Sequence, residues 1–196
     1  MENLQELLQD SIKDLWSAEN QLLKALPKMA KKADSESLQE AILAHLEETK
    51  VQVERLTEIG ELLSMKLTGK KCKAMEGLIE EGKEVLEAEG NPAVIDAAII
   101  AAAQRVEHYE ISAYGSAIAV AHHLGLIEAV ELLNQTLAEE SAADEKLSMI
   151  SLEEILPAAS ATDEVESDDT ENEDNEHPDG KDEEKGAKTP ARKRTR

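Results

Sequence analysis

The sequence LQELLQDSIKDLWSAENQLLKALPKM, residues 4–29, carries apolar residues at alternating steps of three and four. This spacing places them on one face of a helix, which is the pattern of a helix packed in a bundle. Glu19 occupies an inward position of that face, with a leucine about one turn away on either side. The segment therefore predicts a long bundle helix, from about residue 4 to residue 33, that carries an acidic side chain into the core.

Three further segments show the same helical period, at about residues 37–65, 92–123 and 127–151. Ser37 has capping-box spacing to Glu40 at the first start, while Asn91-Pro92 and Gly125 are start and stop signals for the next segment. No run alternates with the period of a strand. We predict that residues 1–157 form an all-α, antiparallel four-helix bundle, with a crossover between the second and third long helices that contains a short fifth helix.

Polar residues interrupt the inward stripe near the middle of every long helix. A single such acid is more often a boundary position than a ligand, but four helices with the same interruption at a compatible depth favour a site. Carboxylates buried together are costly unless positive charge lies among them, and metal ions supply that charge in helix bundles. The candidate ligands are Glu19, Glu48, Gln52, Glu107, Glu110, Glu140 and Asp144.

Buried ion pairs are the competing explanation for these acids. Arg55 and Arg105 lie near the stripes and could neutralise carboxylates structurally. His45 also lies on an inward face, where a lone histidine is more often a satisfied core or interface residue than a ligand. Under this interpretation the protein would be a non-catalytic dimeric helical-bundle interaction protein that binds no metal.

Composition restricts the classes of partner. The net charge of −22 argues against nucleic acid as a partner of the folded body and is compatible with attraction of cations. The N-terminal residues have no signal-peptide pattern, and no apolar run approaches the roughly 18 residues of a membrane span. The single cysteine, Cys72, gives no sign of an oxidising compartment. We expect a cytoplasmic protein that does not enter a membrane.

Residues 158–196 differ in composition from the preceding part. They contain thirteen acidic residues between Asp163 and Glu184, end in the basic sequence ARKRTR, and include Val165 as their one large aliphatic residue. Such a segment cannot bury enough apolar surface to offset the entropy of ordering it. We predict a disordered charged tail, with at most weak nucleic-acid contact through its basic end.

Five segments together resemble the YciF family of bacterial stress-response proteins: SIKDLWSAENQLLKALPKMAKKA, HLEETKVQVERL, CKAMEGLIEEG, DAAIIAAAQRVEHYEISAYG and LLNQTLAEESAADEKL. The resemblance covers about residues 1–152 and keeps the order and spacing of the segments. It implies a ferritin-like, rubrerythrin-type four-helix bundle, a homodimer and a dinuclear iron centre. The biochemical activity of the family is not established.

The ferritin pattern that this resemblance implies is one Glu, then Glu-x-x-His, and then the same two elements again. The acids that match it here are Glu19, Glu48, Glu107 or Glu110, and Glu140. Val51 and Ala143 occupy the two histidine positions, and Gln52 and Asp144 stand one residue further on. Such an oxygen-rich site favours hard ions such as manganese or iron(III). We therefore expect bound iron or manganese, which would oxidise Fe(II) or reduce peroxide or oxygen if the protein is an enzyme.

Overall fold

The computed structural model describes residues 1–161, and within that range all regular structure is helical. The elements are α1 (Leu4–Lys32), α2 (Glu36–Leu62), α3 (Lys73–Glu87), α4 (Pro92–His123), α5 (Ile127–Ile150) and a short π-helix, η1 (Ser151–Ile155). None of the helices in this range combines the length and the apolar character that a membrane span requires. The predicted all-α fold with a short fifth helix is confirmed.

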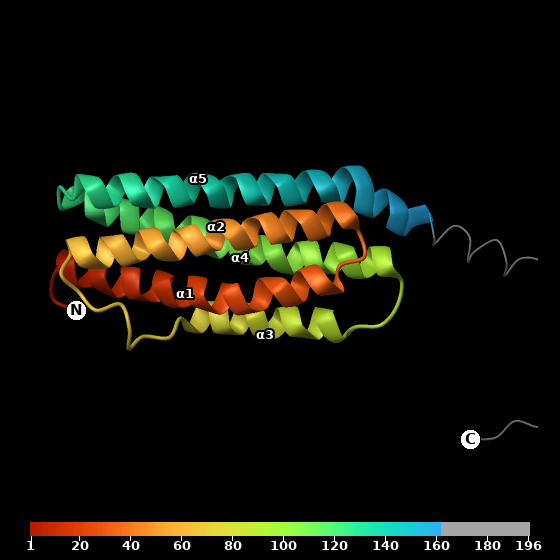
Figure 1. Ribbon diagram of the computed structural model, residues 1–196, viewed down its shortest axis with the longest axis horizontal. Coiled ribbons are helices and arrows are strands. Elements are labelled where there is room, and N and C mark those ends of the chain that lie inside the picture. The colour runs from red at the N-terminus through yellow and green to blue at the C-terminus, as the bar shows by residue number, and fades with distance from the viewer. Residues whose placement is uncertain (162–196) are drawn as a thin grey trace, which may run out of the picture.

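The four long helices form an antiparallel, ferritin-like bundle (Figure 1). Helix α1 packs on α2, and α4 packs on α5. Contacts of α2 with α5 and of α1 with α4 join these two pairs into a four-helix bundle. Helix α3 runs along the outside of the bundle, against α1 and α4, and returns the chain to the end where α4 begins. The crossover therefore lies between the second and third long helices, as predicted, and each long helix presents one face to a common interior.

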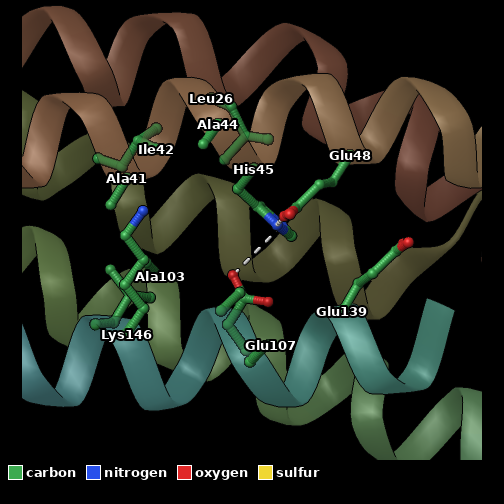
Figure 2. Close-up of a pocket in the computed structure, with 13 residues that line it drawn as sticks. Leu26, Ala41, Ile42, Ala44, His45, Glu48, Ala103, Glu107, Glu139 and Lys146 are labelled. Atoms are coloured by element: carbon green, nitrogen blue, oxygen red, sulfur yellow. Dashed lines mark ion pairs between the residues drawn. The ribbon is translucent and has the colours of Figure 1, made fainter. Parts of the chain in front are cut away.

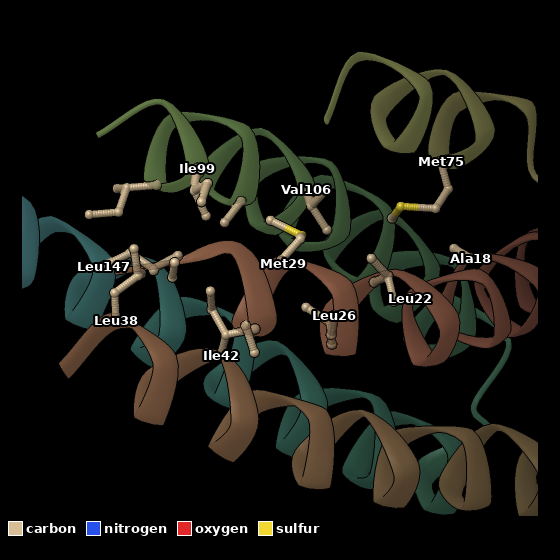
Figure 3. Close-up of a cluster of buried hydrophobic side chains, with 14 of the residues drawn as sticks. Ala18, Leu22, Leu26, Met29, Leu38, Ile42, Met75, Ile99, Val106 and Leu147 are labelled. Carbon is tan, nitrogen blue, oxygen red and sulfur yellow. The ribbon is translucent and has the colours of Figure 1, made fainter. Parts of the chain in front are cut away.

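Two hydrophobic clusters fill this interior. One cluster occupies the end of the bundle where α1 meets α2 and includes Leu26, Ile42 and Ile99 (Figure 3). The other contains residues such as Leu15 and Leu133 toward the opposite end. Most buried polar positions of the long helices lie where the residues of one cluster give way to those of the other; Asp96, near the start of α4, is buried outside this zone. The core is therefore two apolar layers separated by one polar layer.

The start of α2 differs from the prediction. Ser35, not Ser37, is the N-cap, and its hydroxyl accepts the backbone N–H of Leu38 at 3.3 Å. Ser37 instead donates to the carboxylate of Glu154, and buried Asp96 accepts the backbone N–H of Ser35 at 2.7 Å. The predicted Ser37 capping box was wrong because contacts with α4 and η1, which are distant in sequence, decide where this helix begins.

The ends of α4 agree with the prediction. The Asn91 side chain accepts the backbone N–H of Ala93 at 3.0 Å, and Pro92 occupies the first helical position. Gly125 adopts a φ of +73° directly after the helix, a conformation that favours glycine. These local signals therefore predicted both boundaries of α4.

The last helical stretch continues beyond the expected boundary at Pro157. In η1 the Leu156 N–H bonds to the Ser151 carbonyl, a wider turn than in an α-helix, and helix then runs to residue 161. Proline cannot donate a backbone hydrogen bond and clashes with the preceding turn of a regular α-helix, so we attribute the wider turn to Pro157. The first residues of the predicted tail are thus helical, and the rest of it, from residue 162 on, lies outside the described residues.

Candidate metal centre

Four glutamates and one histidine make up most of the polar layer. Glu19 comes from α1, Glu107 and Glu110 from α4, and Glu140 from α5; these four are called the buried glutamates, because each is at most 2% exposed. His45 of α2 is 6% exposed. Because three residues are nearly one helical turn, the two acids of α4 lie on the same face. All four long helices therefore contribute to one site.

Four of these side chains are spaced as ligands of one ion. One ligand atom each from His45, Glu107, Glu110 and Glu140 lies within 4.8 Å of the other three. His45 Nε2 is 3.5 Å from Glu107 Oε1 and 3.7 Å from Glu140 Oε2, and Figure 2 shows the imidazole pointing at Glu107. Ligands about 2 Å from a cation are at most about 4 Å from one another. The observed spread is close to that of a coordination shell.

Glu19 joins the layer from α1 and is held by a tyrosine. Tyr114 donates its hydroxyl to Glu19 Oε1 at 2.5 Å, and both side chains are fully buried. Glu19 Oε2 has no hydrogen-bond partner among the described residues, and Glu110 is a close neighbour. The tyrosine therefore orients the carboxylate and leaves one oxygen for another partner.

Nine buried side-chain oxygen and nitrogen atoms lack a hydrogen-bond partner within residues 1–161, and all of them belong to this layer. They come from Gln52, His45 and the buried glutamates. Buried polar groups are nearly always hydrogen-bonded, and leaving one unpaired costs about 1–3 kcal/mol, more when the group is charged. Carboxylate oxygens and an imidazole nitrogen are common ligands of iron, manganese and zinc. The residues present therefore fit a metal ion.

Burial raises the pKa of every buried glutamate. The pKa of Glu19 rises to about 7, although the Tyr114 hydroxyl opposes the change, and the pKa of Glu107 rises to about 8. Burial and the neighbouring carboxylates raise the pKa values of Glu110 and Glu140 well above the ordinary range. Removal from water disfavours the charged form, and adjacent negative charges disfavour it further. Without a cation, the layer therefore retains protons at neutral pH.

The pKa of His45 is also raised, but for a different reason. Burial lowers its pKa, but the carboxylates around it, first Glu48 and then Glu140 and Glu19, outweigh burial and raise it. Glu48 Oε2 lies 3.5 Å from His45 Nδ1, and the Glu48 side chain is 47% exposed. Glu48 thus stands at the rim of the site, where a carboxylate can orient a metal-binding imidazole from behind.

A cavity of about 110 Å³ leads from this rim to the layer. His45, Glu48, Glu107, Glu139 and Lys146 line it together with three larger apolar side chains, Leu26, Ile42 and Leu147. The rest of the lining is alanine, from α2, α4 and α5, and Figure 2 labels Ala41, Ala44 and Ala103. The alanines leave space that larger apolar residues would fill. The cavity has room for a few water molecules or a molecule of similar size.

Two of the expected ligands have other partners. The Gln52 amide nitrogen donates to Glu139 Oε2 at 3.2 Å. Asp144 accepts from the Gln104 amide at 3.1 Å and lies 3.3 Å from the His108 imidazole. Neither belongs to the cluster of closely spaced ligand atoms, although the Gln52 carbonyl oxygen is buried without a hydrogen-bond partner among the described residues. The structure therefore brings together the buried glutamates and leaves Asp144 at the side.

The two arginines considered as structural partners lie elsewhere. Arg55 makes a two-pronged ion pair with Glu139, at 2.6 and 2.7 Å, and Arg105 is exposed. In residues 1–161, no lysine or arginine pairs with a buried glutamate, and His45 is the only cationic partner they have. Neither arginine therefore forms an ion pair with a buried glutamate in this part of the chain.

His45 is the residue that sequence reasoning undervalued. We expected a satisfied core histidine, yet neither ring nitrogen has a hydrogen-bond partner among the described residues, and both lie near carboxylates. The available signal was its inward position three residues before Glu48, the reverse order of the Glu-x-x-His pattern. The Tyr114–Glu19 contact joins residues far apart in the chain, so no local pattern could indicate it.

Known proteins share both the sequence and the fold. The domain of unknown function DUF892 matches residues 3–160. Protein YciF of Escherichia coli (strain K12) is 45% identical over 156 residues, which are 79% of this chain and 94% of YciF. The family match spans the four long helices and so includes the positions of the polar layer.

Solved structures are also similar to this chain. The crystal structure of the E. coli stress protein YciF has a TM-score of 0.76 and 46% identity, covering 78% of this chain and 96% of that chain. YcfI from Rhodopseudomonas palustris has a TM-score of 0.75 and 42% identity, and the match covers 78% of this chain and 97% of that chain. A protein from Xanthomonas campestris, at 18% identity and a TM-score of 0.63, shares the fold, covering 85% of this chain and 99% of its own. The resemblance found in the sequence is thus confirmed, and the chain belongs to the DUF892 family as a relative of the stress protein YciF.

Proposed function

We propose that this protein binds a pair of iron or manganese ions in its polar layer and acts in the stress response, as its relative YciF is named for doing. The observation that carries the proposal is the set of nine buried oxygen and nitrogen atoms, contributed by all four long helices, that have no hydrogen-bond partner within residues 1–161. If the layer were purely structural, these atoms would lower the stability of the fold and nothing would offset that loss. Metal coordination would give partners to the atoms of the buried glutamates and to one nitrogen of His45.

Ligand positions suggest how two ions would be shared. His45, Glu107, Glu110 and Glu140 would hold one ion. Glu19, whose second oxygen is unpaired and whose neighbour is Glu110, would provide the second position together with shared carboxylates. Two ions would offset the charge of four carboxylates, which explains why the layer needs no arginine.

The reaction we propose is oxidation of Fe(II), or reduction of peroxide or oxygen, at this centre. When bound, a redox-active metal pair supplies electron transfer and polarises an oxygen ligand. The residues of this chain control protons and access: the buried glutamates hold protons that they release when cations bind, and Tyr114 keeps Glu19 in place. The cavity of about 110 Å³ admits only small oxidants.

Metal analysis and thermal unfolding test the proposal. Purified protein should bind about two Fe(II) or Mn(II) per chain and unfold at a higher temperature than in chelator, because ions that bind the native state stabilise it. Glu140→Gln should lose both effects, whereas Glu47→Gln, an exposed position on the outer face of α2, should keep them. A wild-type melting temperature that ignores Fe(II) and Mn(II) would refute the metal centre.

Activity is measured separately, as Fe(II) oxidation in air and peroxide consumption by the metal-loaded protein. Metal binding without either reaction would indicate a metal-binding protein that is not an enzyme, whereas the absence of metal binding would favour the alternative of a non-catalytic bundle. The cytoplasmic location and the homodimer that the resemblance implies are part of the same proposal, and sedimentation of the full chain tests the dimer. The basic C-terminal sequence lies outside the described residues, and weak nucleic-acid contact through it remains a proposal.

A further inference from the structure

A second cavity, of about 310 Å³, lies between α1, α3 and α4 on the side of the bundle that the crossover covers. Its interior is apolar, formed by side chains of all three helices: Leu22, Met29, Leu78, Ile79, Leu86 and Val106. Figure 3 shows Leu22, Met29 and Val106 at the junction of α1 and α4, on the side toward α3. Cavities of this volume and lining belong to the range that binds small molecules.

Lysines surround the mouth of this cavity. Lys24 and Lys28 of α1, Lys71 and Lys83 line it, and none of the described lining residues is acidic. This is unusual in a chain with 43 acidic and 21 basic residues. Lys24 and Lys28 form no ion pair within the described part of the chain, whereas Lys71 and Lys83 pair with glutamates of α3.

The basic surface continues past the cavity. A shallower depression shares Lys28, Lys83 and Leu86 with it and adds Lys31 and Lys32, with Glu87 as its acidic member. Lysine side chains can cover apolar surface with their methylene groups while holding the ammonium at the surface. The cavity therefore has an apolar floor and a positively charged rim.

Helix α3 keeps a glycine where it faces this cavity. Gly82 lines the cavity, and a Cβ added there would meet no atom within 4 Å. Glycine inside a helix destabilises it relative to alanine, so nothing in the packing of α3 requires it. Gly77 of the same helix also has open space around it but does not line the cavity. The missing side chain at Gly82 keeps the cavity open.

We propose that this cavity binds a long-chain carboxylate, with the alkyl chain among the apolar side chains and the carboxylate at the lysine rim. The apolar lining matches an alkyl chain, and Lys24 and Lys28, which form no ion pair within residues 1–161, match an anionic head group. The acidic segment 163–184 of this chain could satisfy the lysines, but Val165 is its one large aliphatic residue, so it offers little for the apolar interior. The ligand that matches both parts carries a long apolar chain and an anionic head.

The experiment is calorimetric titration of the full chain with dodecanoate, below its micelle concentration. Acetate has the same head group without the chain, and dodecyltrimethylammonium has the same chain with the opposite charge. We expect one dodecanoate per chain, no detectable binding of acetate, and an affinity that rises by about fourfold per methylene from octanoate to dodecanoate.

Two matched variants place the binding. Gly82→Leu should weaken dodecanoate at least tenfold because the new side chain enters the cavity, whereas Gly77→Leu, an equivalent change in the same helix, should leave it within twofold. The double variant Lys24→Gln and Lys28→Gln should weaken dodecanoate without weakening dodecyltrimethylammonium. Circular dichroism should show all variants folded.

Three results would overturn the proposal. The first is the absence of dodecanoate binding, and the second is equal loss in the Gly82→Leu and Gly77→Leu variants. The third combines two observations: the wild type does not bind dodecanoate, and Gly82→Leu sediments differently from the wild type. That combination would assign the cavity to contact with a second copy of the chain. Metal binding should be the same in all variants, so this test is independent of the metal centre.

Discussion

Replacing Glu19 by glutamine should stabilise the metal-free protein, and only at neutral and alkaline pH. Glutamine has nearly the same shape, still accepts the Tyr114 hydroxyl, and carries no charge. The pKa of Glu19 is about 7 in the fold against 4.5 ordinarily, chiefly because the side chain is buried. A buried acid with a raised pKa stabilises the fold most when it is protonated.

The direction of the pH dependence follows from how tightly the folded and unfolded states bind the Glu19 proton. The folded protein binds the Glu19 proton more tightly than the unfolded chain does, so its contribution to stability is complete below pH 4.5 and is lost as pH rises through about 7. By pH 8.5 the loss is on the order of 3 kcal/mol. Glutamine does not titrate and avoids this loss. Wild type and Glu19→Gln should therefore be similar near pH 5 and diverge by up to roughly 10 °C in melting temperature at pH 8.5.

The assay is thermal or urea unfolding in chelator, at half-unit steps from pH 5 to pH 9. Because the chain carries a net charge of −22, general repulsion also grows with pH, and removing any acid relieves some of it. Glu47→Gln removes the same charge from an exposed position and corrects for that effect. If the Glu19→Gln curve runs parallel to the Glu47→Gln curve across the whole range, the reasoning about the buried layer is refuted.

Three further predictions concern neighbouring groups. Fe(II) or Mn(II) binding should release protons near pH 7, because the cations displace protons from the buried glutamates. The binding enthalpy should then depend on the ionisation enthalpy of the buffer, and identical enthalpies in all buffers would contradict this. His45→Ala should abolish tight metal binding, measured by dialysis. Glu48→Gln should weaken it by about 10- to 100-fold, because Glu48 contacts the imidazole nitrogen that faces away from the buried glutamates. Equal losses in the two variants would instead make Glu48 a metal ligand. Tyr114→Phe should destabilise the metal-free protein by about 1–3 kcal/mol in urea unfolding, because Glu19 Oε1 loses its donor, and an unchanged midpoint would contradict that contact.

Helical periodicity predicted most of the architecture because the information is local. The apolar stripes of the long helices, the Asn91 cap and the Gly125 stop all act within a few residues, and the structure has each of them. The start of α2 was missed because Asp96 and Glu154, far away in the chain, hold the turn before it. Short-range patterns therefore predicted helices and failed where tertiary contacts decide a boundary.

The same distinction applies to the candidate site. The inward position of Glu19 and Glu140 follows from their stripes, and both are buried. Asp144 has an equally inward position in its stripe, but side chains of α4 hold it at the side, which depends on how α4 and α5 face each other. His45 was undervalued for the same reason: its role depends on carboxylates from α4 and α5 that no single helix displays.

The two adjacent acids of α5 differ in a way that favours the proposed metal site over the ion-pair alternative. Glu139 lies nearer the surface and has a complete partner in Arg55, with two hydrogen bonds. Glu140, one residue later, is fully buried, and both its oxygens lack a hydrogen-bond partner within residues 1–161. Within residues 1–161, the ion-pair partner of Glu140 is the His45 imidazole, at 3.7 Å, and no arginine or lysine pairs with it. Apolar clusters lie on either side of the layer, and buried acids without hydrogen-bond partners between them are the kind of local conflict with stability that functional sites commonly contain.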